Sequence, residues 1–90
     1  MTDARLLVLD AGTTSTRAML YTPDGTRMAT AQRNLGQHYP RPGWVEQDAI
    51  EIWAQSLACA RDMVARAGGA DRIAAIGITN QRETVIAWDK

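Results

Sequence analysis

Six residues near the start of the chain carry groups that could bind a phosphorylated ligand. They are Asp10, Gly12, Thr13, Thr14, Ser15 and Arg17. A carboxylate is a ligand that Mg²⁺ prefers, hydroxyl and backbone N–H groups donate hydrogen bonds, and a guanidinium group is a planar cation. Together these groups suit a metal–polyphosphate complex. The same residue types are also typical of a tight turn in which Asp and Thr cap backbone groups.

The residues around this segment predict the strands that position it. Residues 6–9 are four consecutive apolar residues followed by an acid, which is typical of a strand buried on both faces. The carboxyl end of such a strand lies at the edge where open α/β sheets bind ligands. Residues 16–21 and 26–35 predict two further strands, joined by a Pro- and Gly-containing turn at 22–25. Gly12 is therefore expected in the bend of a β-hairpin, where it permits a close approach or a positive φ.

Two common phosphate-binding loops are absent from the sequence. There is no GxxxxGK(S/T) segment, and no GxGxxG segment opens a helix after the first strand. A phosphate would therefore be held by the backbone and hydroxyl groups of the hairpin, and not by the N-terminus of a helix.

Residues 36–47 form a long connector with two prolines and two glycines. Loops of this length in compact domains tend to be functional or to pack on another part of the protein. We expect Trp44 to anchor the connector on the sheet and His38 to face solvent or to bond to the backbone.

A helix follows the connector. Asp48 is expected to cap its N-terminus, with Glu51 completing a capping-box-like pair, and Gly68 and Gly69 are expected to end it. Apolar residues at helical spacing predict the buried stripe, which is read as core. The stripe consists of Ile50, Trp53, Leu57, Ala60, Val64 and Ala67, widened by Ile52, Cys59 and Met63.

The last part of the chain predicts a buried strand at residues 72–79 and the start of another at residue 85. A connection through a helix places the first of these parallel to the opening strand, so residues 80–84 emerge at the same edge as Asp10. Two of the strands are apolar on both faces, whereas a single helix covers one face. We therefore expect the rest of a longer protein, or a homo-oligomer partner, to cover the other face.

The composition excludes several classes of protein. Ninety residues with 46% hydrophobic content suffice for one small domain. Ten acidic and ten basic residues are interspersed without a basic stripe, which argues against a nucleic-acid partner. The longest apolar run is too short to span a membrane, and the polar start is unlike a secretory signal. Cys59 is the single cysteine and is expected in the core, and the cytoplasm is the expected location.

Four blocks of sequence together resemble the FGGY family of carbohydrate kinases, over essentially the whole chain. They are residues 10–17, 39–48, 51–53 and 74–84. The resemblance implies an α/β fold, the N-terminal part of an actin-like ATPase (ribonuclease H-like) domain. This part comprises a three-stranded antiparallel β-meander, one helix, a parallel strand and the start of a further strand. Residues 1–90 would then be the N-terminal segment of the first kinase domain, without the rest of that domain or the second domain.

The same resemblance implies that the full-length protein transfers the γ-phosphoryl group of ATP to a primary hydroxyl, with Mg²⁺. By position in the family's motifs, Asp10 would bind Mg²⁺ through water, and the nucleotide would be bound by Gly12, Thr13, Thr14, Ser15 and Arg17. Gln81-Arg82-Glu83 is similar to the block of members that act on glycerol, whereas xylulose kinases typically have Gln-Met-His. Arg82 and Glu83 would therefore contact the acceptor, glycerol or a similar polyol, and the product would be glycerol 3-phosphate.

Without the resemblance, a surface ion pair at a strand end is the favoured interpretation of Arg82 and Glu83. The family's catalytic base, an aspartate, lies beyond Lys90, so these residues alone are expected to be inactive.

Two positions depart from the family's pattern. Members that phosphorylate glycerol usually have Gln where this chain has Ala11, and Pro commonly opens the helix where it has Ala49. Another polyol or a ketose sugar therefore stays open as the acceptor. A non-enzymatic actin-like nucleotide-binding module is the alternative from another class. Sugar-sensing repressors of a related kinase family carry Asp-x-Gly-Gly-Thr and usually a preceding DNA-binding segment, and this sequence has neither.

Overall fold

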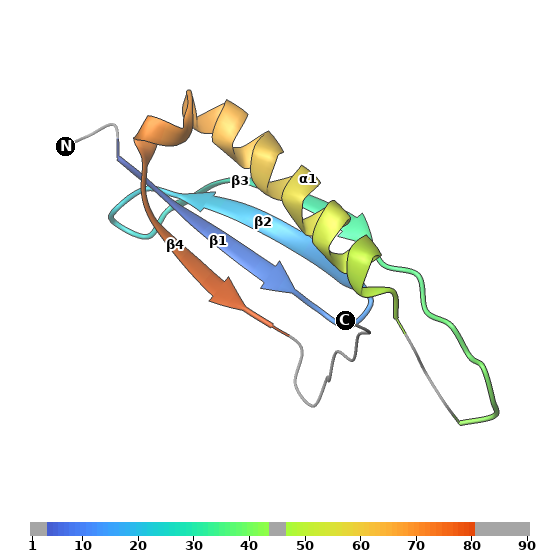
Figure 1. Ribbon diagram of the computed structural model, residues 1–90. Helices are drawn as coiled ribbons and strands as arrows, with labels where there is room; N and C mark the ends of the chain where they lie inside the picture. The colour runs from blue at the N-terminus through green and yellow to red at the C-terminus, as the bar shows by residue number, and fades with distance from the viewer. Residues whose placement is uncertain (1–3, 44–46, 81–90) are drawn as a thin grey trace.

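Four strands form one mixed sheet, and a long helix lies across one of its faces (Figure 1). The computed structural model describes residues 4–43 and 47–80. The elements, in chain order, are β1 (Arg5–Ala11), β2 (Ser15–Tyr21), β3 (Arg27–Asn34), α1 (Ala49–Ala67), a short 3₁₀ helix η1 (Ala70–Arg72) and β4 (Ile73–Thr79). The strand order is β3-β2-β1-β4, with β1 antiparallel to β2, β2 antiparallel to β3, and β1 parallel to β4. The predicted meander, helix and parallel strand are confirmed, whereas the strand predicted from residue 85 lies outside the described residues.

The turn between β2 and β3 has the predicted chemistry. Gly25 adopts a φ of 92°, and its N–H donates to the carbonyl of Thr22 at 3.0 Å. The carboxylate of Asp24 accepts from the hydroxyl of Thr22 and from the N–H of Thr26. The Thr22 hydroxyl is the main reason why the pKa of Asp24 lies below its ordinary value. The turn therefore fixes the register of the hairpin through local hydrogen bonds.

Both ends of α1 are capped as expected, but the predicted contact of Glu51 with the N-cap residue is wrong. The carboxylate of Asp48 accepts from the N–H groups of Ile50 at 2.9 Å and Glu51 at 3.4 Å. The carboxylate of Glu51 instead accepts from the N–H of Gly36, at the start of the connector. At the other end, Gly68 adopts a φ of 99° and donates to carbonyls of the last turn. The first turn of the helix thus also ties down the chain that leaves β3.

The core lies between α1 and the sheet, and it corrects the predicted stripe. Its buried members are Leu7, Ala18, Leu20, Cys59 and Met63. Ile50 and Trp53, predicted to be buried, are 78% and 64% exposed. Helix residues three and four positions apart share a face. The face through Cys59 and Met63 packs on the sheet, so Ile50 and Trp53 lie on a neighbouring flank.

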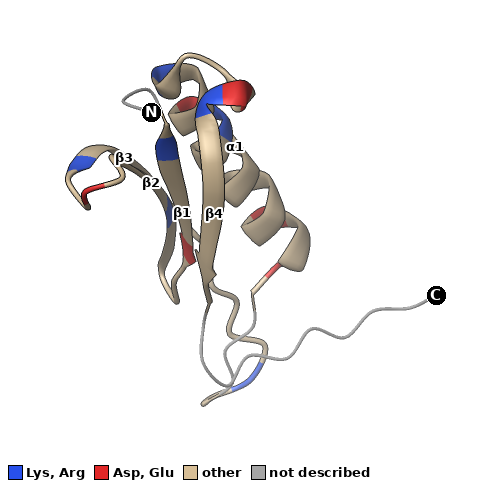
Figure 2. Ribbon diagram, turned by 90° about the vertical axis from the view of Figure 1, so that its left-hand side faces the viewer, with Lys and Arg blue, Asp and Glu red and all other residues tan. Residues whose placement is uncertain are grey.

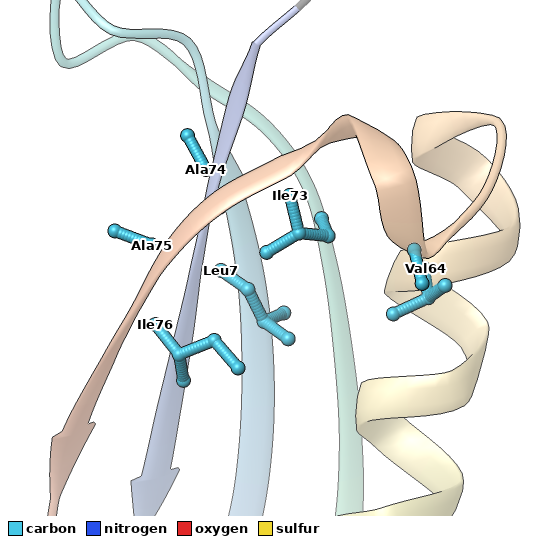
Figure 3. A pocket seen from close by; sticks show the side chains of 7 residues that line it. Leu7, Val64, Ile73, Ala74, Ala75 and Ile76 are labelled. Carbon is cyan, nitrogen blue, oxygen red and sulfur yellow. The ribbon is translucent and has the colours of Figure 1, made fainter.

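A hollow lies between the strands and the C-terminal part of α1, beside β4 (Figure 3). The hollow has a volume of about 310 Å³, and Figure 3 shows Val64 of α1 across from Leu7, Ile73 and Ile76 of the strands. Because α1 lies over β1, β2 and β3, the side chain of Ile76 is 57% exposed on β4, and that of Ile78 is 73% exposed. The described residues therefore leave an apolar surface uncovered along β4.

The single cysteine lies in the core, as predicted. Cys59 is buried and free, and its Sγ lies 3.9 Å from the carbonyl oxygen of Thr16. Burial raises the pKa of its thiol above the ordinary value.

Among the described residues, no helix combines the length and apolarity that crossing a membrane would require.

Candidate nucleotide-binding site

The carboxyl ends of β1 and β4 meet at one edge of the sheet, as the sequence predicts (Figure 2). Asp10 is in register with Thr79. The Thr79 hydroxyl donates a hydrogen bond to Oδ1 of Asp10 at 2.8 Å, although the two residues are sixty-nine positions apart in sequence. The chain that follows β4 thus starts beside Asp10. Arg82 and Glu83, the predicted acceptor ligands, lie outside the described residues.

Asp10 also has a cationic neighbour on its other side. Arg17 of β2 is in register with Asp10, and its Nε lies 3.9 Å from Oδ2 of Asp10. Arg17, Asp10 and Thr79 therefore form a row across three adjacent strands. Since side chains alternate along a strand and Leu7 faces α1, the row lies on the opposite face of the sheet. Both ionic side chains are accessible to solvent, so their attraction adds little stability and they can take a ligand.

The bend between β1 and β2 contains the remaining predicted residues. Thr13 and Thr14 are exposed, whereas Ser15 is buried. A Cβ atom on Gly12 would lie 2.8 Å from the carbonyl oxygen of Ser15. Gly12 is not among the glycines with positive φ in the described chain. Glycine is therefore required at position 12 because the backbone of Ser15 leaves no room for a side chain.

Two donors outside the hairpin hold the carbonyl groups of the bend. The N–H of Leu35, just after β3, donates to the carbonyl of Thr14 at 2.9 Å. The side-chain amide of Gln47, just before the cap of α1, donates to the carbonyl of Thr13 at 2.5 Å. The sequence alone predicted no role for Gln47. Its position in the connector block was the only signal, because contact with Thr13 spans 34 positions.

A buried pair of hydroxyls joins the start of β2 to the helix. Thr16 is 1% exposed, and its Oγ1 lies 2.7 Å from Oγ of Ser56. The Thr16 hydroxyl also lies 3.4 Å from the carbonyl oxygen of Asp10. Thr16 therefore faces α1, whereas its neighbour Arg17 faces the side of the sheet that carries Asp10. The sequence alone did not predict Ser56 as a partner of the hairpin.

The donor set fits a magnesium ion that arrives with a nucleotide. Among the described residues, no three or more His, Cys, Asp or Glu side chains gather as a metal cluster. Mg²⁺, however, is usually held by one or two carboxylates together with substrate phosphates and water. Asp10 supplies one accessible carboxylate, whose oxygens accept more hydrogen bonds or ligands than Thr79 and Arg17 occupy.

Comparison with solved structures defines the class of protein. A glycerol kinase from Plasmodium falciparum, crystallised with ADP, matches 96% of this chain with a TM-score of 0.82 and 33% identity. A xylulose kinase from Lactobacillus acidophilus matches 87% of it with a TM-score of 0.79 and 26% identity. The matches cover 18% and 16% of those two chains. The sheet and its helix thus have the fold of the N-terminal part of an actin-like sugar kinase, as predicted.

The sequence gives the family directly. Residues 5–90 match the model of the N-terminal domain of the FGGY family of carbohydrate kinases, and the chain belongs to this family. A glycerol kinase from Citrifermentans bemidjiense is 57% identical over 86 residues, which cover 94% of this chain. The chain spans about 17% of the length of that relative.

Proposed function

We propose that the full-length protein containing this chain phosphorylates glycerol with ATP, giving ADP and glycerol 3-phosphate. The observation that carries the proposal is the contact between Thr79 and Asp10, because it brings the ends of β1 and β4 to one edge of the sheet. The curated glycerol kinases that are similar to this chain support glycerol as the acceptor.

The nucleotide residues divide the work of phosphoryl transfer, which consists mainly of positioning and charge neutralisation. The exposed hydroxyls of Thr13 and Thr14, and the backbone of Gly12 and Ser15, would bind phosphate oxygens. The guanidinium of Arg17 would add a charge-assisted bond. Asp10 would hold Mg²⁺ through water, and the bound ion would neutralise charge on the phosphates. Asp10 is in turn held by Thr79.

The acceptor residues follow from the chemistry of a polyol. A polyol hydroxyl both donates and accepts, so Glu83 would accept from it and Arg82 would donate to it. Both residues follow β4 closely in sequence, and β4 ends beside Asp10. The catalytic base would come from a later part of the full-length protein, so we expect no turnover by residues 1–90 alone.

Glu83→Ala in the full-length protein tests the acceptor assignment. We expect the KM for glycerol to rise roughly tenfold or more, as for loss of a charged hydrogen bond, while the KM for ATP changes by less than about twofold. Asp62→Ala, which removes an exposed carboxylate that pairs with Arg66 on α1, is the matched control. Equal increases in both KM values would remove the assignment.

A screen of polyols and ketoses, coupled to ADP release, tests the acceptor itself. We expect glycerol to give the highest kcat/KM. If a ketose gives a higher kcat/KM than glycerol, the protein is instead a related sugar kinase, and the similar structure of a xylulose kinase would support that outcome. ATP hydrolysis that no polyol or ketose changes would instead indicate a non-enzymatic actin-like module.

The proposed function also bears on what covers β4 and on where the protein is located. The exposed apolar surface along β4 would be covered by the remainder of the full-length protein, since the chain spans about 17% of its relatives' length. A cytoplasmic location agrees with the use of ATP. Solvent-accessible side chains of Ile76 and Ile78 in the full-length protein, measured by covalent footprinting, would contradict coverage of β4 by the later chain.

A further inference from the structure

We propose that Gln47 is a positioning residue for nucleotide binding, because its side chain fixes the orientation of the peptide between Thr13 and Thr14. This inference rests on the proposed function, which supplies the phosphate that the bend binds. It adds a residue outside the hairpin to the site and gives a role to the end of the connector.

The contact itself has only one chemical reading. The carbonyl oxygen of Thr13 can only accept, so the group of Gln47 that faces it must be the amide nitrogen, which donates. Gln47 is half-buried and directly precedes Asp48, whose carboxylate caps α1. The start of the helix therefore fixes the backbone from which the side chain of Gln47 reaches the bend.

Because the peptide unit is planar, the contact that fixes the carbonyl of Thr13 also fixes the direction of the next N–H group. A trans peptide is planar, so its C=O and N–H groups point to opposite sides. With the carbonyl of Thr13 held by Gln47, the N–H of Thr14 points away from the connector. The same reasoning applies to the next peptide, whose carbonyl is held by the N–H of Leu35. Backbone N–H groups directed outward from a turn are donors for an anion.

The Thr13–Thr14 peptide is the central peptide of the bend between Gly12 and Ser15. Rotating it by half a turn would bring its carbonyl oxygen to the ligand side in place of an N–H donor. That oxygen would repel a phosphate where the donor attracts it. The neighbouring peptide is held by a backbone donor, whereas the central one is held by a side chain. Its orientation can therefore be changed by substituting a single residue.

Gln47→Met in the full-length protein tests the inference. Methionine matches glutamine in length, adds no charge and cannot donate a hydrogen bond. Gln55→Met is the matched control, because Gln55 lies on α1 and accepts from Arg33, away from the bend. We expect Gln47→Met to raise the dissociation constant for ATP with Mg²⁺ roughly five- to tenfold. The KM for glycerol and the midpoint of thermal unfolding should match those of Gln55→Met.

NMR relaxation dispersion of the nucleotide-free protein gives a second readout. The backbone amide of Thr14 should show greater exchange broadening in Gln47→Met than in Gln55→Met, because without the Gln47 contact the peptide interconverts between the two orientations. If wild type binds ATP and Gln47→Met binds it equally tightly, the positioning role is wrong while the proposed function stands. A shared loss of stability and of both substrate affinities would show that Gln47 only supports the fold. If the wild-type protein binds no ATP, the proposed function fails and this inference fails with it.

Discussion

The hydroxyl of Thr79 donates to Oδ1 of Asp10 at 2.8 Å, from the last residue of β4 to the penultimate residue of β1. The other carboxylate oxygen of Asp10 faces Arg17 on the opposite neighbouring strand. On one face of the sheet, Asp10 is thus contacted from both neighbouring strands. A carboxylate held in this way presents its remaining lone pairs in a fixed direction, which favours binding of a hydrated cation.

Thr79→Val removes the hydroxyl and keeps the branched shape of the side chain. We expect the Mg²⁺ concentration that gives half-maximal activity of the full-length protein to rise about three- to fivefold, the range for one lost hydrogen bond. The unfolding free energy should change by less than about 0.5 kcal/mol, because the side chain is exposed. Thr30→Val, at an exposed position on β3, is the control. A Mg²⁺ dependence identical to that of Thr30→Val would contradict the role of Thr79.

Gly12→Ala places a Cβ atom against the carbonyl oxygen of Ser15, 2.8 Å away, so the bend must open. We expect a loss of about 1–3 kcal/mol in unfolding free energy, as for other overpacked sites, and a much weaker affinity for ATP. Denaturant unfolding and nucleotide titration of the full-length protein measure the two effects. Gly77→Ala is the control, since its Cβ would meet only Val8 Cγ2 at 3.9 Å. Equal behaviour of the two variants would show that the bend tolerates a side chain.

Thr16 and Ser56 should be energetically coupled through their 2.7 Å contact. Ser56→Ala leaves the buried hydroxyl of Thr16 without this partner and should cost about 1–2 kcal/mol of unfolding free energy. Thr16→Val alone should cost a similar amount. The double variant should lose about 1 kcal/mol less than the sum of the two, which a double-mutant cycle measures. Strict additivity would mean that the contact does not hold β2 on the helix.

Cys59 should make the stability of the protein sensitive to alkaline pH. Burial raises the pKa of its thiol above the ordinary value of 9.0, with a smaller contribution from Asp62. The folded state therefore retains a proton that the unfolded chain releases, so this stability is complete below the unfolded pKa and is lost as pH rises through the folded pKa. Between about pH 8 and pH 10.5, unfolding free energy should fall more steeply for wild type than for Cys59→Ala. Parallel curves would contradict the shift.

The sequence predicted the elements because their signals are local. The apolar run of β1, the turn at residues 22–25, the Asp48 cap and the glycines after α1 each act within a few residues. The rotation of α1 about its own axis is not local. Apolar residues occupy more than one side of this helix, and only the sheet decides that Cys59 and Met63 face the core while Trp53 does not. Periodicity alone therefore included Ile50 and Trp53 in the buried face, although both are exposed.

In the candidate site, too, some features could be predicted from the sequence and others could not. The shared edge of β1 and β4 followed from topology, because a helical connection makes the strands parallel. The contacts of Gln47 with Thr13 and of Ser56 with Thr16 depend on side-chain reach across 34 and 40 positions. No local pattern reports such distances. The roles of Arg82 and Glu83 stay predictions.

The supports of the bend have a consequence for biosynthesis. Leu35, Gln47, Ser56 and Thr79 all follow the bend within the first 79 residues, and the chain spans about 17% of the length of its relative. Domains fold as units during translation, with N-terminal parts first. The bend and its supports can therefore form before the later residues of a full-length protein are synthesised, while Ile76 and Ile78 are still exposed.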